Sequence, residues 1–325
     1  MIQRCALLGV VLVLAVVAAA CGRTSDRTLR GSLEALGTPT PAVATTKQPN
    51  WPCSAAHRAD PTASLRPLGP LPAPEQLPAG SYMSTIRHRG KLIAGVDQNT
   101  LFLSYLDPFK RSLQGLEIDL LRRLAKAIFG KTSAIRFETP TTSTDRIAYV
   151  EDGKVDAGAG AITIDCGRLQ DVAFSSVYYQ AAQRVLVPTN SPAPVLNALA
   201  GKRVCARAGT TTYARLAELP FHVIRVPVQV RTDCLVDLQE GKVDAISADD
   251  TILLGFQKQD PYTRLLPGSL EPEPYGIAIR QSHPDFVRFV NGVLARMRAD
   301  GELRALDRKW LGSAAQPVPP AKYKD

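Results

Sequence analysis

The chain has few aromatic residues and lacks the short motifs typical of common enzyme classes. Aromatic residues make up 6% of the 325 residues, and there is no Gly-x-Ser-x-Gly segment to carry a hydrolase nucleophile. The segment 158–160, Gly-Ala-Gly, has no third glycine and so does not match a dinucleotide-binding fingerprint. The histidines are too far apart in sequence for a local zinc motif: His57, His88, His222 and His283. The sequence therefore gives no support to a metal site, a bound cofactor or a catalytic function.

Basic residues outnumber acidic residues without forming a basic tract. The formal net charge is +9, yet no run of five or six Lys or Arg residues occurs. Nucleic-acid-binding chains usually gather their basic residues on one segment or face, so this scatter does not indicate a nucleic-acid partner. Attraction to anionic lipid or to the cell wall is the simpler consequence of the charge.

The first residues have the pattern of an export signal. Arg4 precedes an apolar run at 6–17, and small residues at 18–20 stand directly before Cys21. The run is shorter than the ~20 residues that span a bilayer. The pattern resembles the bacterial lipoprotein signal, and it predicts a signal peptide at 1–20 and lipid on Cys21. This anchor places the protein on the outer face of the cytoplasmic membrane.

The two segments that flank the central part are rich in residues that oppose regular structure. Residues 21–81 are rich in Pro, Ala, Thr and Gly, which predicts an extended tether after the lipidated cysteine. Residues 313–325 have a similar composition and predict a flexible tail.

Strand-like runs alternate with helical patterns in the central part, which is typical of an α/β fold. Residues 92–96 form an apolar strand-like run, and apolar residues from Leu121 to Ile128 recur at helical spacing. Residues 145–157 and 233–245 align without a gap, and both end in Gly-Lys-Val-Asp-Ala. This repeat predicts two lobes of similar plan. Their ligand site is expected where the carboxyl edges of the two sheets face each other.

The cysteines predict disulfide bonds, because export brings the chain into an oxidising compartment. Once Cys5 is lost with the signal and Cys21 is lipidated, the remaining cysteines allow three pairings: Cys53, Cys166, Cys205 and Cys234. We favour the pair Cys205–Cys234, since both residues fall in the same lobe. This leaves Cys53 to join the N-terminal arm to Cys166.

A series of short segments carries a family resemblance through its order and spacing. They include GKLIAGVD at 90–97, GLEIDL at 115–120, AITIDCGR at 161–168, VDAISAD at 243–249, YGIA at 275–278 and KWLG at 309–312. The chain resembles the bacterial extracellular solute-binding proteins of family 3, which bind amino acids for polar amino-acid ABC transporters.

The resemblance implies a two-lobed α/β periplasmic-binding-protein fold of type II. It places lobe 1 at 86–186 plus 277–312 and lobe 2 at 187–276, with the ligand cleft between the lobes. Two crossover hinge strands are expected near 184–188 and 274–279.

Three residues depart from the family's usual pattern. Leu116 and Glu117 stand where phenylalanine and aspartate are usual, and Ala161 replaces a frequent glycine. The first two are expected on a packing helix, with little effect on the site. Ala161 is expected nearer the ligand, where it can shift the backbone.

The resemblance also implies a site for a zwitterion, and both charges of a buried zwitterion need partners. Arg168 is expected to bind the α-carboxylate through two charge-assisted hydrogen bonds, with the Thr163 hydroxyl nearby. The loop that begins at Arg207 is expected to enter a helix at Thr210 and Thr211. Free backbone N–H groups there would bind the same carboxylate.

More than one residue is a candidate to bind the ligand's ammonium group, and the same holds for the ligand's side chain. Asp249 is expected to bind the ammonium, or Asp250 after a one-residue slip of the strand. Ser143 and Arg146 resemble the pair that holds the distal carboxylate in glutamate/aspartate-binding relatives. Asp97 resembles the aspartate that accepts from the amide in glutamine-binding relatives. The expected ligand is therefore glutamate or aspartate, or else glutamine or asparagine.

Other side chains near this site have more than one interpretation. Arg207 either neutralises Asp97 or reaches the ligand. Phe102 and Tyr105 either line the floor of the pocket or fill the core.

The resemblance implies that the protein is a monomer that binds its ligand without catalysis and delivers it to an ABC permease. It implies no cofactor and no metal. One alternative is a sensor subunit that reports amino-acid occupancy to a membrane receptor. A second is a dehydratase on the same scaffold, like the cyclohexadienyl dehydratases. That reaction needs an acidic general acid, which nothing in the sequence singles out.

Overall fold

A computed structural model describes residues 60–325. The predicted signal peptide, Cys21 and Cys53 lie outside these residues. The helices are η3 Pro74–Gln76, α2 Tyr82–Arg89, α3 Leu116–Phe129, α4 Ser143–Glu151, α5 Arg168–Asp171, η4 Leu196–Leu199, α6 Thr211–Arg215, α7 Asp233–Gln239, α8 Asp250–Gln259, α9 Pro284–Ala299, α10 Glu302–Leu311 and η5 Gly312–Ala314. The strands are β1 Leu92–Gly95, β2 Asn99–Thr100, β3 Ser104–Asp107, β4 Ser112–Gln114, β5 Ile135–Glu138, β6 Ala157–Gly158, β7 Val172–Phe174, β8 Tyr179–Pro188, β9 Arg203–Arg207, β10 Ile224–Val228, β11 Ala245–Asp249, β12 Thr263–Leu265, β13 Pro272–Tyr275 and β14 Ala278–Arg280.

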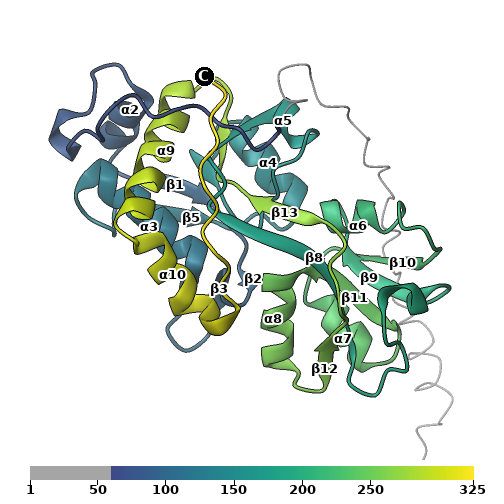
Figure 1. The fold of residues 1–325 in the computed structure, drawn as a ribbon. Helices are drawn as coiled ribbons and strands as arrows, with labels where there is room; N and C mark the ends of the chain where they lie inside the picture. The colour runs from purple at the N-terminus through teal and green to yellow at the C-terminus, as the bar shows by residue number, and fades with distance from the viewer. Residues whose placement is uncertain (1–59) are drawn as a thin grey trace, which may run out of the picture. The chain divides into compact units, whose positions relative to one another are not determined.

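Two mixed sheets of the same plan form the two lobes (Figure 1). In lobe 1 the order is β5-β1-β6-β14-β7, with β5, β1 and β6 parallel and β14 antiparallel to its neighbours. In lobe 2 the order is β10-β9-β11-β8-β12, with β10, β9 and β11 parallel and β8 antiparallel to β11 and β12. The predicted two-lobed α/β fold is confirmed.

The sequence repeat has a physical role that is the same in both lobes. Its last aspartate, Asp156 or Asp244, directly precedes the central strand, β6 or β11. Asp156 accepts a hydrogen bond from the backbone N–H of Ile93 in β1 at 2.7 Å, and Asp244 accepts one from that of Arg203 in β9 at 2.8 Å. Each carboxylate thus fixes the first strand of its sheet against the central strand.

A glycine stands at each end of α3, a helix of lobe 1. Gly115 precedes α3 with φ of 128°, and a Cβ at this position would lie 2.1 Å from the carbonyl oxygen of Leu103. Gly130 ends α3 in the left-handed region with φ of 77°. Between these glycines the predicted apolar stripe is buried, with Leu121, Leu124, Ala125 and Ile128 fully covered.

The lobes are joined where β8 pairs antiparallel with β13. The pairing runs from Tyr179, opposite Tyr275, to Ala182, opposite Pro272. The first crossover therefore lies before the predicted 184–188, because those residues already pair with β11 and β12 inside lobe 2. The second crossover overlaps the predicted 274–279.

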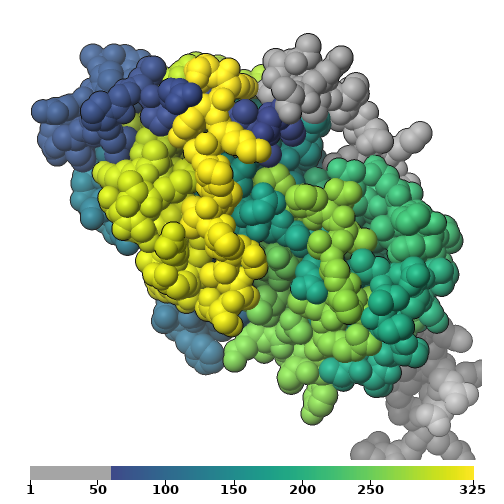
Figure 2. Space-filling model, in the orientation of Figure 1, coloured from purple at the N-terminus to yellow at the C-terminus, as the bar shows by residue number. Residues whose placement is uncertain are grey.

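The C-terminal segment, for which the composition predicts a flexible tail, contacts the folded part of the chain in this structure. Lys322 pairs with Asp60 at 2.8 Å, and Asp325 pairs with Arg288. The backbones of Ser64 and Tyr323 form a parallel bridge, so part of the predicted tether is also ordered. Figure 2 shows the C-terminal segment, in yellow, lying on the molecular surface.

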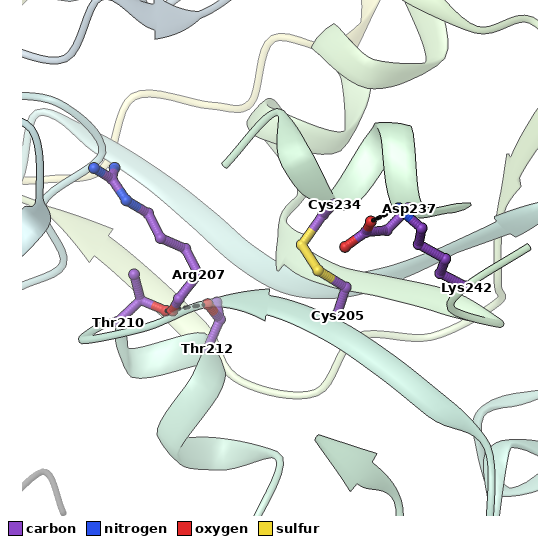
Figure 3. The surroundings of a disulfide bond; sticks show 7 residues. All are labelled: Cys205, Arg207, Thr210, Thr212, Cys234, Asp237 and Lys242. Carbon is purple, nitrogen blue, oxygen red and sulfur yellow. Dashed lines mark hydrogen bonds and ion pairs between the residues drawn. A yellow bond between two sulfur atoms is a disulfide. The ribbon is translucent and has the colours of Figure 1, made fainter. Parts of the chain in front are cut away.

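One disulfide joins strand and helix in lobe 2. Cys205 of β9 and Cys234 of α7 are bonded, as predicted, with their Cα atoms 5.6 Å apart. Figure 3 shows this bond with Arg207, on the same strand, directed away from it. Cys166 is also disulfide-bonded, while Cys53, its predicted partner, lies outside the described residues.

Replacing both Cys205 and Cys234 by alanine is expected to lower the free energy of unfolding by about 3 kcal/mol, because the bond closes a loop in the unfolded chain. Urea unfolding followed by circular dichroism measures this change. An unchanged unfolding midpoint in the double variant would contradict the expectation.

Candidate functional site

A small pocket lies where the two lobes meet, and both lobes contribute charged residues to its wall. The space between its walls, counting the part open to solvent, is about 400 Å³. Lobe 1 contributes Ala161, Thr163 and Arg168, and lobe 2 contributes Arg207, Thr210, Thr211, Thr212, Arg231, Cys234, Ile246, Ser247, Ala248, Asp249 and Ile252. The structure thus brings together most of the residues that the sequence assigns to ligand binding.

Arg168 is fixed at the lobe 1 side of this pocket. It is the first residue of α5, and its Nη1 donates to the carbonyl oxygen of Thr163 at 2.6 Å. The Asp165 carboxylate lies 3.4 Å from the Nε of Arg168. These contacts orient the guanidinium toward the pocket, where a carboxylate can receive its remaining N–H groups.

Thr210 and Thr211 begin the short helix α6 on the opposite wall. Thr210 is the N-cap: its hydroxyl accepts from the backbone N–H of Tyr213 at 3.2 Å and lies 2.8 Å from the hydroxyl of Thr212. The Thr211 hydroxyl instead donates to Glu273 at 2.8 Å.

Asp249 and Asp250 face different surroundings. Asp249 ends β11 in the pocket wall and accepts a hydrogen bond from the Tyr275 hydroxyl at 2.5 Å. Burial raises the pKa of Asp249 to about 6, although Tyr275 and Arg231 favour its ionised form. Asp250 begins α8 and lies beside Tyr179 and Arg184, outside this pocket. The chain turns from β11 into α8 between these two residues, which directs the two carboxylates to different surroundings.

Asp97 is the centre of a buried ion-pair cluster. Its carboxylate lies 2.8 Å from Arg207 Nη1 of lobe 2 and 3.3 Å from Arg146 Nη1 of lobe 1. Burial would raise the pKa of Asp97, but the guanidiniums of Arg146, Arg231 and Arg207 hold it at about 2. Arg207 therefore neutralises Asp97, one of its two expected roles, while it also lines the pocket.

Arg146 and Ser143 are placed behind the pocket wall. Arg146 is fully buried in α4, where it donates to the Ser143 hydroxyl at 3.3 Å and to the carbonyl oxygen of Gly160 at 3.1 Å. Neither residue is part of the pocket lining. Their contacts support Asp97 and the backbone of Gly160.

Tyr105 and Phe102 also lie outside the pocket lining. The ring of Tyr105 packs edge-on against Trp310, with centroids 6.3 Å apart. Phe102 is partly buried and packs against the core, which agrees with the second expectation for this pair.

Glu117 has a larger role than its assignment to a packing helix suggests. It is fully buried, and its Oε1 accepts from the backbone N–H of Ala161 at 2.7 Å and from the Tyr178 hydroxyl at 2.5 Å. Ala161 has φ of 52°, which a β-carbon disfavours. Glu117 thus holds a strained residue of the pocket wall, so the expectation that it matters little was wrong.

Two charged residues near the site were missed by the sequence analysis. Glu273 of β13 accepts hydrogen bonds from Thr163 of lobe 1 and Thr211 of lobe 2. Arg231, between β10 and α7, lines the pocket and donates to the Thr100 hydroxyl of lobe 1 at 2.9 Å. Neither residue belongs to the segments that carry the resemblance, and only the fold brings them to the site.

Within residues 60–325, no helix has the length and apolar character needed to cross a membrane. The same residues contain no cluster of three or more His, Cys, Asp or Glu side chains arranged for a metal ion.

Two lobes joined by paired crossover strands, with a charged pocket between them, define a solute-binding protein of type II fold. The sequence profile of the bacterial extracellular solute-binding proteins, family 3, matches residues 92–313, and the chain belongs to this family.

Relatives and solved structures agree with this membership. The ABC transporter glutamine-binding protein GlnH of Bacillus subtilis (strain 168) is 27% identical over 70% of this chain and 84% of its own length. The glutamine-binding protein of Geobacillus stearothermophilus is 32% identical over 60% of this chain and 74% of its own. An ancestral arginine-binding protein bound to glutamine superposes with a TM-score of 0.64, at 28% identity, over 69% of this chain and 99% of its own. The solute receptor for L-cysteine of Neisseria gonorrhoeae superposes with a TM-score of 0.67, at 26% identity, over 70% of this chain and 93% of its own length.

The buried acid Glu273 is expected to make stability fall as pH rises. Burial and the nearby Asp249 raise the pKa of Glu273 to about 8, against 4.5 for an exposed glutamate. Below about pH 4.5 the Glu273 carboxyl is protonated in both the folded and the unfolded protein. As the pH rises above 4.5, the unfolded chain loses this proton first, so the free energy of unfolding declines until about pH 8.

Glu273→Gln removes this titration and is expected to flatten the decline in melting temperature across the same pH range. Glu271→Gln, a half-buried control two residues away, should keep the wild-type slope. Equal slopes in the wild type and the Glu273 variant would contradict a raised pKa.

Proposed function

We propose that the protein binds one polar amino acid between its lobes and delivers it to an ABC importer, without performing chemistry on it. A pocket with a cation from one lobe and a carboxylate from the other carries this proposal. Arg168 receives the α-carboxylate, with Thr163 and the start of α6 nearby, and Asp249 receives the α-ammonium. Both charges of the zwitterion then have a buried partner of opposite sign, which burial requires.

The names of the relatives support an amino-acid ligand. They include proteins named for binding glutamine, L-cystine and glutamate/aspartate. The family is extracellular, and we propose that lipid on Cys21 holds the protein, as a monomer, at the outer face of the cytoplasmic membrane. Acyl labelling of wild type and Cys21→Ala tests this anchor.

Arg168→Ala is expected to weaken the binding of every amino acid by about 100-fold or more, because the ligand carboxylate then lies buried without its cation. A thermal-shift screen of the twenty amino acids identifies the wild-type ligand through its stabilisation of the folded state. Calorimetry with that ligand then measures the loss in the variant.

Arg215→Ala is the matched control, because this arginine of α6 pairs with Glu218 at the surface of lobe 2. It should bind like the wild type. Tight binding by the Arg168 variant would refute the assignment of the α-carboxylate, and an absence of any stabilising amino acid for wild type would refute the proposed function.

A further inference from the structure

Arg231 differs from the other arginines of the pocket wall in its partners. Arg207 uses Nε for the carbonyl oxygen of Gln229, Nη1 for Asp97 and Nη2 for the carbonyl oxygen of Thr141. Arg231 has one hydrogen bond among the described residues, from Nη1 to the Thr100 hydroxyl at 2.9 Å. A guanidinium has five N–H donors, so most of those on Arg231 are free for a ligand.

Arg231 also lacks a carboxylate partner. Asp165 pairs with Arg168, and Asp97 is shared by Arg146 and Arg207. No carboxylate of residues 60–325 lies within 4.0 Å of Arg231, although its side chain is buried, with the residue 6% exposed. Its charge lowers the pKa of both Asp97 and Asp249 and so favours their ionised forms.

The charges of the pocket wall are therefore unbalanced toward the positive side. Its lining contains three guanidiniums, those of Arg168, Arg207 and Arg231, but Asp249 is its one carboxylate. Asp97 behind the wall offsets Arg207, and it must also offset the buried Arg146. Asp165 offsets Arg168, so these four guanidiniums face three carboxylates. A neutral zwitterion leaves one positive charge unbalanced, whereas a ligand with a second carboxylate balances it. A buried charge without a partner is destabilising, so a ligand with a second carboxylate is favoured over a neutral zwitterion.

We propose that Arg231 binds the side-chain carboxylate of the ligand and that the ligand is therefore a dicarboxylic amino acid, glutamate or aspartate. This inference rests on the proposed function, in which Arg168 and Asp249 hold the α-carboxylate and α-ammonium. The planar guanidinium suits a carboxylate through two parallel hydrogen bonds. The bond to Thr100 orients it and ties it to the other lobe.

Calorimetry on the ligand-stripped full mature chain tests this assignment with glutamate, aspartate, glutamine and asparagine. Wild type is expected to bind at least one acid about tenfold or more tightly than its amide, since the amide leaves a buried cation unpaired. Arg231→Gln is expected to weaken the acid by about 100-fold and the amide by less than about threefold, which reverses the preference.

Arg225→Gln is the matched control, because it removes the same charge from an exposed position on β10, over the ring of Tyr213. It should keep the wild-type ratio of acid to amide. Arg231→Lys keeps the charge without the planar fork, and it should still prefer the acid with weaker binding. This variant provides the test if Arg231→Gln does not melt cooperatively.

The possible failures are distinguishable. Wild type that prefers an amide, a basic amino acid or cystine overturns the role of Arg231 and leaves the proposed function standing. Equal losses for acid and amide in the Arg231 variants also overturn it. Wild type that binds no amino acid overturns the proposed function together with this inference.

Discussion

The charge and the wall of the pocket depend on the buried carboxylate of Asp97, which residues of both lobes contact. Asp97 contacts Arg146 of its own lobe and Arg207 of the other lobe, and its pKa of about 2 keeps it ionised. Removing one partner of a buried ion pair leaves an uncompensated charge, at a cost of roughly 3–5 kcal/mol. The ion pair of Asp97 with Arg207 joins the two lobes beside the pocket. It also affects the charge of the site, because Arg146 and Arg207 share this one acid, and Arg231 has no carboxylate partner among the described residues.

A second buried acid shapes the wall without touching the space inside. Glu117 holds the backbone of Ala161 and receives the hydroxyl of Tyr178, and Tyr178 packs near Tyr275, which in turn donates to Asp249. Burial raises the pKa of Glu117, while Tyr178 and the backbone of Ala161 oppose this rise. Ala161 and Asp249, on opposite sides of the pocket wall, are thus connected through packed polar groups in the core.

The sequence predicts what depends on local pattern and chain order. The repeat at 145–157 and 233–245 indicated twin lobes, and the location of Cys205 and Cys234 in one lobe indicated their bond. Contacts between side chains that are far apart in the sequence could not be predicted in this way. Arg231 and Glu273 reach the pocket only because a turn in lobe 2 and a crossover strand approach lobe 1, and neither lies in a recognisable motif. Likewise, the proline-rich C-terminal segment gave no sign of the ion pairs that hold it.

Recognition and closure use the same contacts in this molecule. Each polar residue that crosses from one lobe to the other either lines the pocket or bonds to a residue that does: Arg207 to Asp97, Arg231 to Thr100, and Glu273 to a hydroxyl from each lobe. Separation of the lobes would break these bonds and would divide the pocket between two surfaces. A ligand that fills the pocket therefore binds the closed arrangement more tightly than the open one, and this difference in affinity is the free energy available to drive closure. A membrane partner that contacts both lobes can then distinguish loaded from empty protein without contacting the ligand.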